Sequence, residues 1–156
     1  MKIEVKNPSV LISPTGFGIR NDPQGEGHYG ASRGSHKHKG IDFLCCQGQD
    51  VVCPIEWGII TRKAYPYAND KKYEGLVIEN DLISIKLFYC IVFKDFIGKK
   101  VQRGEHIAMA QNIANKYSPY PDGEEMKPHI HLEINKCDPD LFMDHIASFN
   151  HSFVSS

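Results

Sequence analysis

Two histidines alternate with apolar residues in the stretch "KPHIHLEI", near the end of the chain. Side chains alternate across a β-strand, so His129 and His131 share one face, while Ile130, Leu132 and Ile134 share the other and pack on a core. The two imidazoles start from Cα atoms roughly 6–7 Å apart. At that separation both imidazoles can belong to one small site, in which one binds a metal ion and the other lies beside the ion. A pair of exposed or hydrogen-bonded histidines is the alternative.

A second cluster of polar residues lies in "HKHKGIDF", where His38 and Asp42 are four positions apart. Fully extended, that separation is roughly 13 Å, which is too far for two ligands of one ion. The segment must therefore bend, and Gly40 makes a bend cheap. A nitrogen and an oxygen are both good zinc donors. One further histidine from the "HIH" strand makes three ligands and leaves a position for water, which is typical of a catalytic zinc.

The motifs resemble those of a known family. "SHKHKGIDF" is similar to the HxGxD element of the lysostaphin/LytM-type zinc peptidases, and "KPHIHLEI" is similar to their HxH element. Three further stretches also fit, in the same order along the chain: "GFGIRNDP", "GQDVVCPIEWGII" and "VQRGEHIA". The resemblance covers about residues 15 to 140.

The resemblance implies an antiparallel β-sheet core with a groove, zinc held by His38, Asp42 and His131, and His129 as a catalytic group beside the metal. In that family the substrate is typically a peptide of bacterial peptidoglycan. The function expected is therefore a zinc endopeptidase of the cell wall, in which a zinc-bound water attacks the scissile carbonyl and His129 is the general base.

One position departs from the family pattern. The family usually has a second catalytic histidine upstream of Gly98, where this chain has Tyr89 or, less readily, Cys90. The stretches "GEGHYGASR", "YPYAN" and "IKLFYC" resemble the branch of leukocyte-cell-derived chemotaxin two, which is regarded as lacking peptidase activity, and the departure fits that branch. A catalytically weak or inactive zinc-stabilised binding module is therefore the alternative function. A tyrosine hydroxyl can donate to an oxyanion. Tyr89 could equally be a core aromatic residue beside Leu87.

Other polar side chains carry weaker signals. His36 lies beside His38 but outside the motif position, and His28 belongs to a long polar loop over residues 21–40. Arg20 and Arg33 could bind a peptide carboxylate or tie down this loop. The histidines outside both motifs are expected on the surface: His106, His145 and His151.

Short strands separated by turns must position these residues, which favours a mainly antiparallel β fold in a single domain, 1–156. Residues 75–80 and 82–93 predict a hairpin around Asn80 and Asp81. In its second strand, Ile83, Ile85, Leu87 and Tyr89 are expected on one face. The stretch "DPDLFMDHIASF", residues 138–149, predicts a short C-terminal helix.

Composition excludes several function classes. The chain has 156 residues, 41% of them hydrophobic, and a formal net charge of −1, so we expect no binding to nucleic acid or anionic membrane and no membrane insertion. Five cysteines are an odd number, which favours free buried thiols.

The N-terminal stretch is unlike a secretion signal. We therefore expect synthesis in the cytoplasm and action at the wall after lysis, by non-classical export or as a component of a phage tail or virion.

Overall fold

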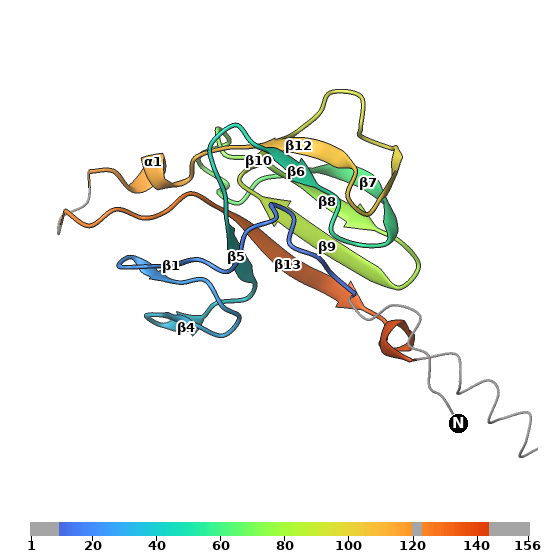
Figure 1. The fold of residues 1–156 in the computed structure, drawn as a ribbon, viewed down its shortest axis with the longest axis horizontal. Coiled ribbons are helices and arrows are strands. Elements are labelled where there is room, and N and C mark those ends of the chain that lie inside the picture. Colours follow the sequence, from blue (N-terminus) through green and yellow to red (C-terminus); the bar gives the residue numbers. More distant parts are fainter. Residues whose placement is uncertain (1–9, 120–122, 144–156) are drawn as a thin grey trace, which may run out of the picture.

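A computed structural model describes residues 10–119 and 123–143 of the chain. Its main element is a six-stranded antiparallel sheet (Figure 1). The strands, in spatial order, are β11 (Lys100–Gln102), β7 (Trp57–Ala64), β8 (Gly75–Glu79), β9 (Ile83–Phe88), β13 (His129–Cys137) and β5 (Ile41–Leu44). The mainly β prediction is therefore confirmed.

A second, three-stranded antiparallel sheet contributes the other half of the core. Its strands, in spatial order, are β10 (Cys90–Val92), β12 (His106–Ala110) and β6 (Asp50–Val52). Buried residues from both sheets form one apolar cluster, for example Leu76 and Ile85 from the large sheet with Val51 and Ile107 from the small one. This core holds the strands that carry the candidate site.

The predicted hairpin is confirmed as β8 and β9. The two strands pair antiparallel, with Ile78 opposite Ile85, and the side chain of Asn80 accepts backbone hydrogen bonds from Leu82 and Ile83 in the turn. β8 is buried on both faces, which explains its continuous apolar sequence. Gly75 is required there because an added Cβ would collide with the backbone of β9.

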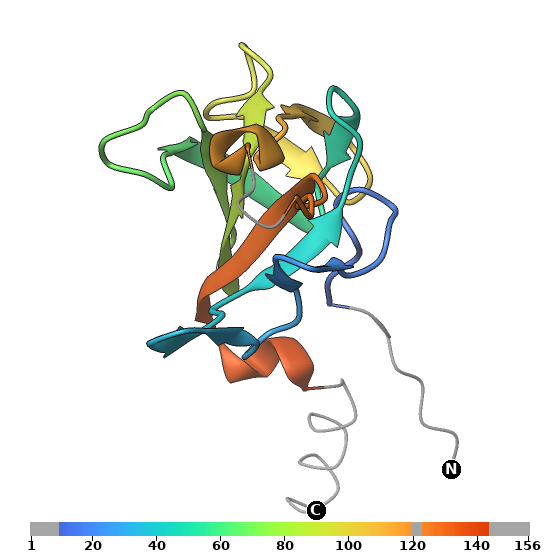
Figure 2. The same ribbon diagram turned by 90° about the vertical axis from the view of Figure 1, so that its left-hand side faces the viewer.

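The polar loop of residues 21–40 folds into two small hairpins at one end of the molecule, shown in blue in Figure 1. The first pairs β1 (Asn21–Asp22) with β2 (Gly25–Glu26), and the second pairs β3 (Ser32–Arg33) with β4 (His36–Lys37). The start of β13 and the short helix α1 (Ala114–Tyr117) lie at the same end, which faces the viewer in Figure 2.

Two expectations about side-chain faces were wrong. Ile134 shares a face with Ile130 and Leu132 in the pattern, yet it is 47% exposed and lies beyond Leu132, the last residue of β13 that pairs with β5. Tyr89 does not continue the apolar face of β9. Its φ of +73° is left-handed, so the chain turns there and re-aims the side chain.

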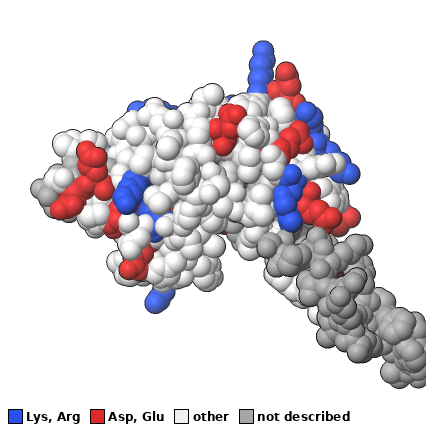
Figure 3. Space-filling view, in the orientation of Figure 1, with Lys and Arg blue, Asp and Glu red and all other residues white. Residues whose placement is uncertain are grey.

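Only the beginning of the predicted C-terminal helix lies within the described residues, where Pro139–Phe142 forms a 3-10 helix capped by Asp138. Residues 144–149 of that prediction lie outside the described part of the chain. The five cysteines are free thiols; Cys45, Cys53 and Cys90 are buried as expected, whereas Cys46 is exposed and Cys137 is half-buried. None of the described helices is long and apolar enough to cross a membrane. Acidic and basic side chains are intermingled on the face in Figure 3, in keeping with the near-neutral net charge.

Candidate metal centre

The register of two neighbouring strands brings His131 and Asp42 together. β13 pairs antiparallel with β5 so that His131 lies directly opposite Asp42, and side chains opposite each other share a face. The His131 Nδ1 atom is 2.8 Å from Asp42 Oδ1. Both residues are buried, with 9% and 3% exposure. The chain around them is thus folded to place an imidazole and a carboxylate in contact away from bulk water.

His38 joins this pair from the β3–β4 hairpin. Backbone hydrogen bonds with Gly30 and Ala31 hold His38 in place. Its Nε2 atom is 3.2 Å from Asp42 Oδ1 and 3.1 Å from His131 Nδ1. The sequence correctly singled out Gly40, but the reason is close packing and not an unusual backbone conformation. Its φ is not left-handed, but an added Cβ would lie 2.8 Å from the His131 ring and would collide with the backbone of β13.

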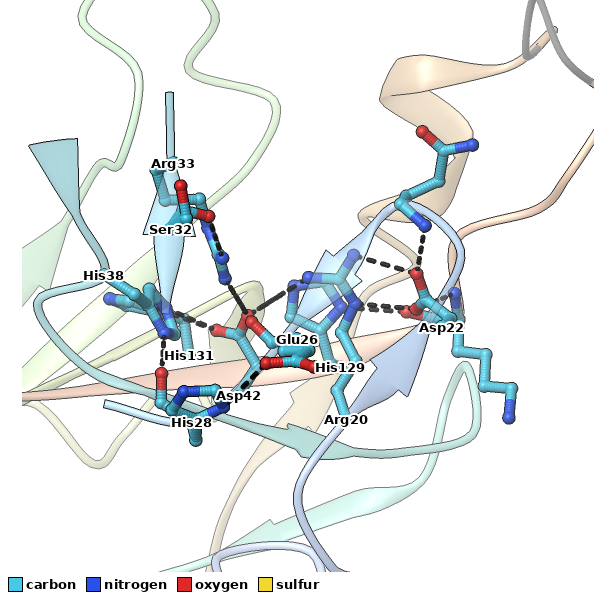
Figure 4. A network of polar contacts seen from close by, with 12 residues as sticks. Arg20, Asp22, Glu26, His28, Ser32, Arg33, His38, Asp42, His129 and His131 are labelled. Atoms are coloured by element: carbon cyan, nitrogen blue, oxygen red, sulfur yellow. Dashed lines mark hydrogen bonds and ion pairs between the residues drawn. The ribbon is translucent and has the colours of Figure 1, made fainter. Parts of the chain in front are cut away.

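The outer nitrogens of His38 and His131 each have their own hydrogen-bond acceptor, and Figure 4 shows the one of His38. His38 Nδ1 donates to the carbonyl oxygen of His28 at 2.9 Å, and His131 Nε2 donates to Glu133 Oε1 at 2.9 Å. This is the arrangement by which proteins fix the tautomer of a metal-bound histidine. It leaves the inner nitrogens unprotonated when both rings are neutral, so two lone pairs and a carboxylate oxygen face one point.

Three converging acceptors repel one another unless a positive charge lies between them. A tetrahedral zinc with bonds of about 2.0–2.1 Å separates its ligand atoms by about 3.3 Å. The three observed separations, from 2.8 to 3.2 Å, are close to that spacing. His38, Asp42 and His131 together could hold a metal ion, and the donor set and the outer partners fit zinc.

Without a metal, a proton on His131 supplies positive charge between the acceptor atoms. Burial lowers the pKa of His131, but its hydrogen bonds to Asp42 and Glu133 raise the pKa above the ordinary value.

Two arginines bind the second oxygen of Asp42. Arg20 Nη1 is 3.2 Å and Arg33 Nη2 is 3.4 Å from Asp42 Oδ2. Burial alone would raise the pKa of Asp42, but the hydrogen bond from His131 and the neighbouring imidazoles hold it at about 2. Asp42 is therefore ionised near neutral pH, and the arginines leave Oδ1 to face the histidines.

Arg20 is itself held by Asp22. The pair forms two hydrogen bonds, of 2.7 and 3.0 Å, and both side chains are almost fully buried. Asp22 Oδ2 also accepts a hydrogen bond from the backbone N–H of Lys127, just before β13. The sequence allowed two roles for Arg20, binding a peptide carboxylate or holding the loop in place. In the structure, Arg20 holds the loop in place.

His129 lies beside the three converging atoms without belonging to them. Its Nδ1 donates to the carbonyl oxygen of Lys127 at 2.8 Å, and its Nε2 is 3.7 Å from Asp42 Oδ2. The Nε2 lone pair is consequently available to a neighbouring donor. Burial lowers the pKa of His129, so the ring favours its neutral form.

Tyr89 reaches the site because of its left-handed backbone. The ring meets His129 edge-on at 5.5 Å, and the hydroxyl is 3.4 Å from the hydroxyl of Tyr67. Burial raises the pKa of Tyr89 to about 12, so the hydroxyl keeps its proton and remains a donor. Cys90, the other residue considered at this position, is fully buried in the core. The reading of Tyr89 as a core aromatic is therefore wrong.

A groove of about 400 Å³ runs past these side chains. Residues from four separate segments line it, among them Gln24, Tyr89, Ile113, Met126 and His129.

His36 and the His28 ring are exposed and lie outside the triad of His38, Asp42 and His131, although the His28 carbonyl orients His38. Glu133 was missed in the sequence. It shares the face of His129 and His131 by strict alternation, so the pattern could have revealed it. Tyr67 belongs to the "YPYAN" stretch of the resemblance, but nothing in the sequence marked it or Tyr117 as part of the site.

Comparison with known proteins identifies the family. No family model matches the chain. Leukocyte cell-derived chemotaxin-2 of Bos taurus is 30% identical over 124 residues, which are 78% of this chain and 76% of that protein. The chain belongs to the lysostaphin/LytM-type family, in the branch of this chemotaxin.

Two solved structures resemble the fold more distantly. A solution structure of lysostaphin matches with a TM-score of 0.48 at 18% identity and covers 83% of this chain, which spans only 46% of that one. The catalytic domain of the antimicrobial peptidase lysostaphin from Staphylococcus simulans also has a TM-score of 0.48, at 20% identity, with 78% and 90% covered. Both likenesses are too weak to support a functional argument, and membership of the lysostaphin/LytM-type family rests on the chemotaxin.

Proposed function

We propose that this protein is a zinc-dependent endopeptidase that hydrolyses peptide bonds of bacterial peptidoglycan, with zinc on His38, Asp42 and His131. One observation supports the proposal above all. Three acceptor atoms converge at the wall of an open groove, and a fourth polar side chain, His129, lies beside them without being needed to hold an ion. A closed structural metal site would have no use for the groove or for His129.

A zinc ion held by His38, Asp42 and His131 would supply a Lewis acid, which would lower the pKa of a water and polarise the scissile carbonyl. The protein's own residues supply the rest. The Lys127 carbonyl fixes the proton of His129 on Nδ1, so Nε2 accepts a proton from the attacking water. Arg20 and Arg33 hold Asp42 Oδ2, so that Oδ1 stays turned toward the histidines during the reaction.

Tyr89 is the proposed donor to the developing oxyanion. Its hydroxyl lies in the groove wall and keeps its proton near neutral pH. Removal of one oxyanion donor typically costs about 10²–10³ in rate. Tyr89→Phe should therefore slow turnover by about that factor while it leaves zinc content unchanged. An unaltered rate would remove Tyr89 from the mechanism.

The test is hydrolysis of purified cross-linked muropeptides by zinc-loaded protein, followed by mass spectrometry. The wild type should release defined peptide fragments, and His129→Gln should lose turnover with zinc still bound. His106→Gln is a matched control, because His106 pairs with Asp50 on the surface, away from the groove. Absence of turnover with zinc confirmed in the site would refute the endopeptidase.

A second candidate function is a zinc-stabilised binding module with little or no catalysis. Tyr89 at the place of a family histidine favours it, together with the likeness to leukocyte cell-derived chemotaxin-2. In that case chelation lowers the melting temperature, and binding of a partner peptide survives His129→Gln. Loss of all measurable function in a folded, zinc-loaded His129→Gln protein would exclude the module.

A further inference from the structure

The groove does not end at the candidate metal centre. A second hollow of about 510 Å³ shares five lining residues with the first and continues past Phe88 and Glu133; the shared residues are Arg33, His38, Tyr89, Tyr117 and His131. We name this second hollow the outer arm. Its lining includes a basic group, which we call the basic wall, and an aromatic group, which we call the aromatic wall; they are Arg33, His36 and Lys39, and Tyr67, Phe88 and Tyr117.

The basic wall of the outer arm carries charge that the protein leaves without a partner. Lys39 and His36 are exposed, and neither forms an ion pair within residues 10–119 and 123–143. Arg33 shares its single carboxylate, Asp42, with Arg20. The one acidic side chain of the outer arm, Glu133, binds His131.

The first part of the groove differs in this respect. Arg20 is its other cation, and Asp22 and Asp42 already bind that guanidinium. A peptide that lies across the metal would therefore meet surplus positive charge on one side only. Because opposite charges at a partly exposed site attract, an anionic group of the peptide should occupy the outer arm.

The aromatic wall suits a peptide rather than a free anion. The Phe88 ring stacks on His131 at 5.9 Å with an interplanar angle of 11°, which gives a flat apolar surface beside the triad. The hydroxyls of Tyr67 and Tyr117 share a hydrogen bond of 2.7 Å. Flat rings with polar tips bind peptide backbone and aliphatic carbons, and they leave the charge to the basic wall.

We propose that the outer arm is a subsite for an acidic residue of the peptide, with Lys39 as a specificity-determining residue and Arg33 beside it. The inference rests on the proposed function for the placement of a peptide across the metal. It adds a substrate class: a peptide segment with a free side-chain carboxylate is preferred to an uncharged one such as a glycine bridge.

The test compares two capped pentapeptides that differ only in a central glutamate or glutamine, each titrated by NMR into zinc-loaded His129→Gln protein. That variant keeps a donor for the Lys127 carbonyl and does not consume the peptide. An exposed ion pair contributes up to about 1 kcal/mol, so the glutamate peptide should bind about three- to fivefold more tightly. The preference should shrink at high salt.

Lys39→Glu should abolish this preference or reverse it. Lys37→Glu makes the same charge change two residues away, on an exposed lysine that does not line the groove, and should keep the preference. Equal affinities of the two peptides, or equal effects of the two lysine variants, would overturn the subsite. The proposed function is judged separately: a wild-type protein that prefers glutamate but cleaves nothing fails only as an enzyme, and one that cleaves both peptides alike fails only in the subsite.

Discussion

The two faces of β13 behave in opposite ways. On one face Ile130 and Leu132 are buried against apolar neighbours and need nothing further. On the other face His129, His131 and Glu133 are buried or half-buried among polar groups, and three acceptor atoms converge between His131 and its neighbours. The apolar face needs no ligand to be stable. On the polar face, the repulsion between the converging acceptor atoms is relieved only when a cation or a proton lies between them.

This difference separates folding from function within one strand. The apolar face is expected to set the free energy of unfolding, and the polar face is expected to set metal affinity. Substitutions on each face should therefore move one quantity and leave the other nearly unchanged.

The largest effect is expected from His131→Ala on the polar face. Each of three ligands carries a comparable share of a zinc binding free energy of about 10 kcal/mol or more, so affinity should fall by about 300-fold or more. Titration calorimetry measures this loss. Zinc should raise the melting temperature of the wild type and of His129→Gln, but not that of His131→Ala. Zinc binding to His131→Ala with wild-type affinity would show that the ion lies elsewhere.

Ile130→Ala breaks the apolar face instead. Ile130 is fully buried, so the loss of its side chain should lower the free energy of unfolding by about 2–5 kcal/mol. Urea denaturation of the zinc-free protein measures the change. The folded fraction should still bind zinc with unchanged stoichiometry, and a large loss of zinc affinity in that fraction would contradict the separation of the two faces.

Glu133→Gln tests the outer partner of His131. The substitution keeps an acceptor near His131 Nε2 but removes its charge, so zinc affinity should fall by about 10–100-fold. Calorimetry should show this with little change in the urea midpoint of the zinc-free protein. An unchanged zinc affinity would mean that Glu133 does not orient the ring.

The smallest effect is expected from Ile134→Thr. Ile134 follows the apolar alternation but is 47% exposed, so its replacement should change the free energy of unfolding by no more than about 0.5 kcal/mol. Urea denaturation alongside Ile130→Ala gives the comparison. A cost similar to that of Ile130→Ala would mean that the apolar face extends further along β13 than described.

Much of the fold could be predicted from the sequence because local patterns dominate it. Alternation in residues 129–132 and the turn at Asn80 correctly predicted strand faces and a hairpin, since both depend on neighbouring residues. Alternation failed at Ile134 and Tyr89. Ile134 is exposed and lies beyond the part of β13 that pairs with β5. The direction of the Tyr89 side chain depends on a backbone turn that the sequence does not mark.

The sequence by itself determined the chemistry available: two histidine motifs, a carboxylate and a glycine between His38 and Asp42, in the order of a known family. Only the tertiary structure decided how these groups meet. The register of β5 against β13 puts Asp42 opposite His131, the outer hydrogen bonds of His28 and Glu133 aim the lone pairs inward, and the turn at Tyr89 brings a hydroxyl to the groove. These relations join residues up to 93 positions apart, and such long-range pairing is set by packing of the whole core rather than by any local pattern.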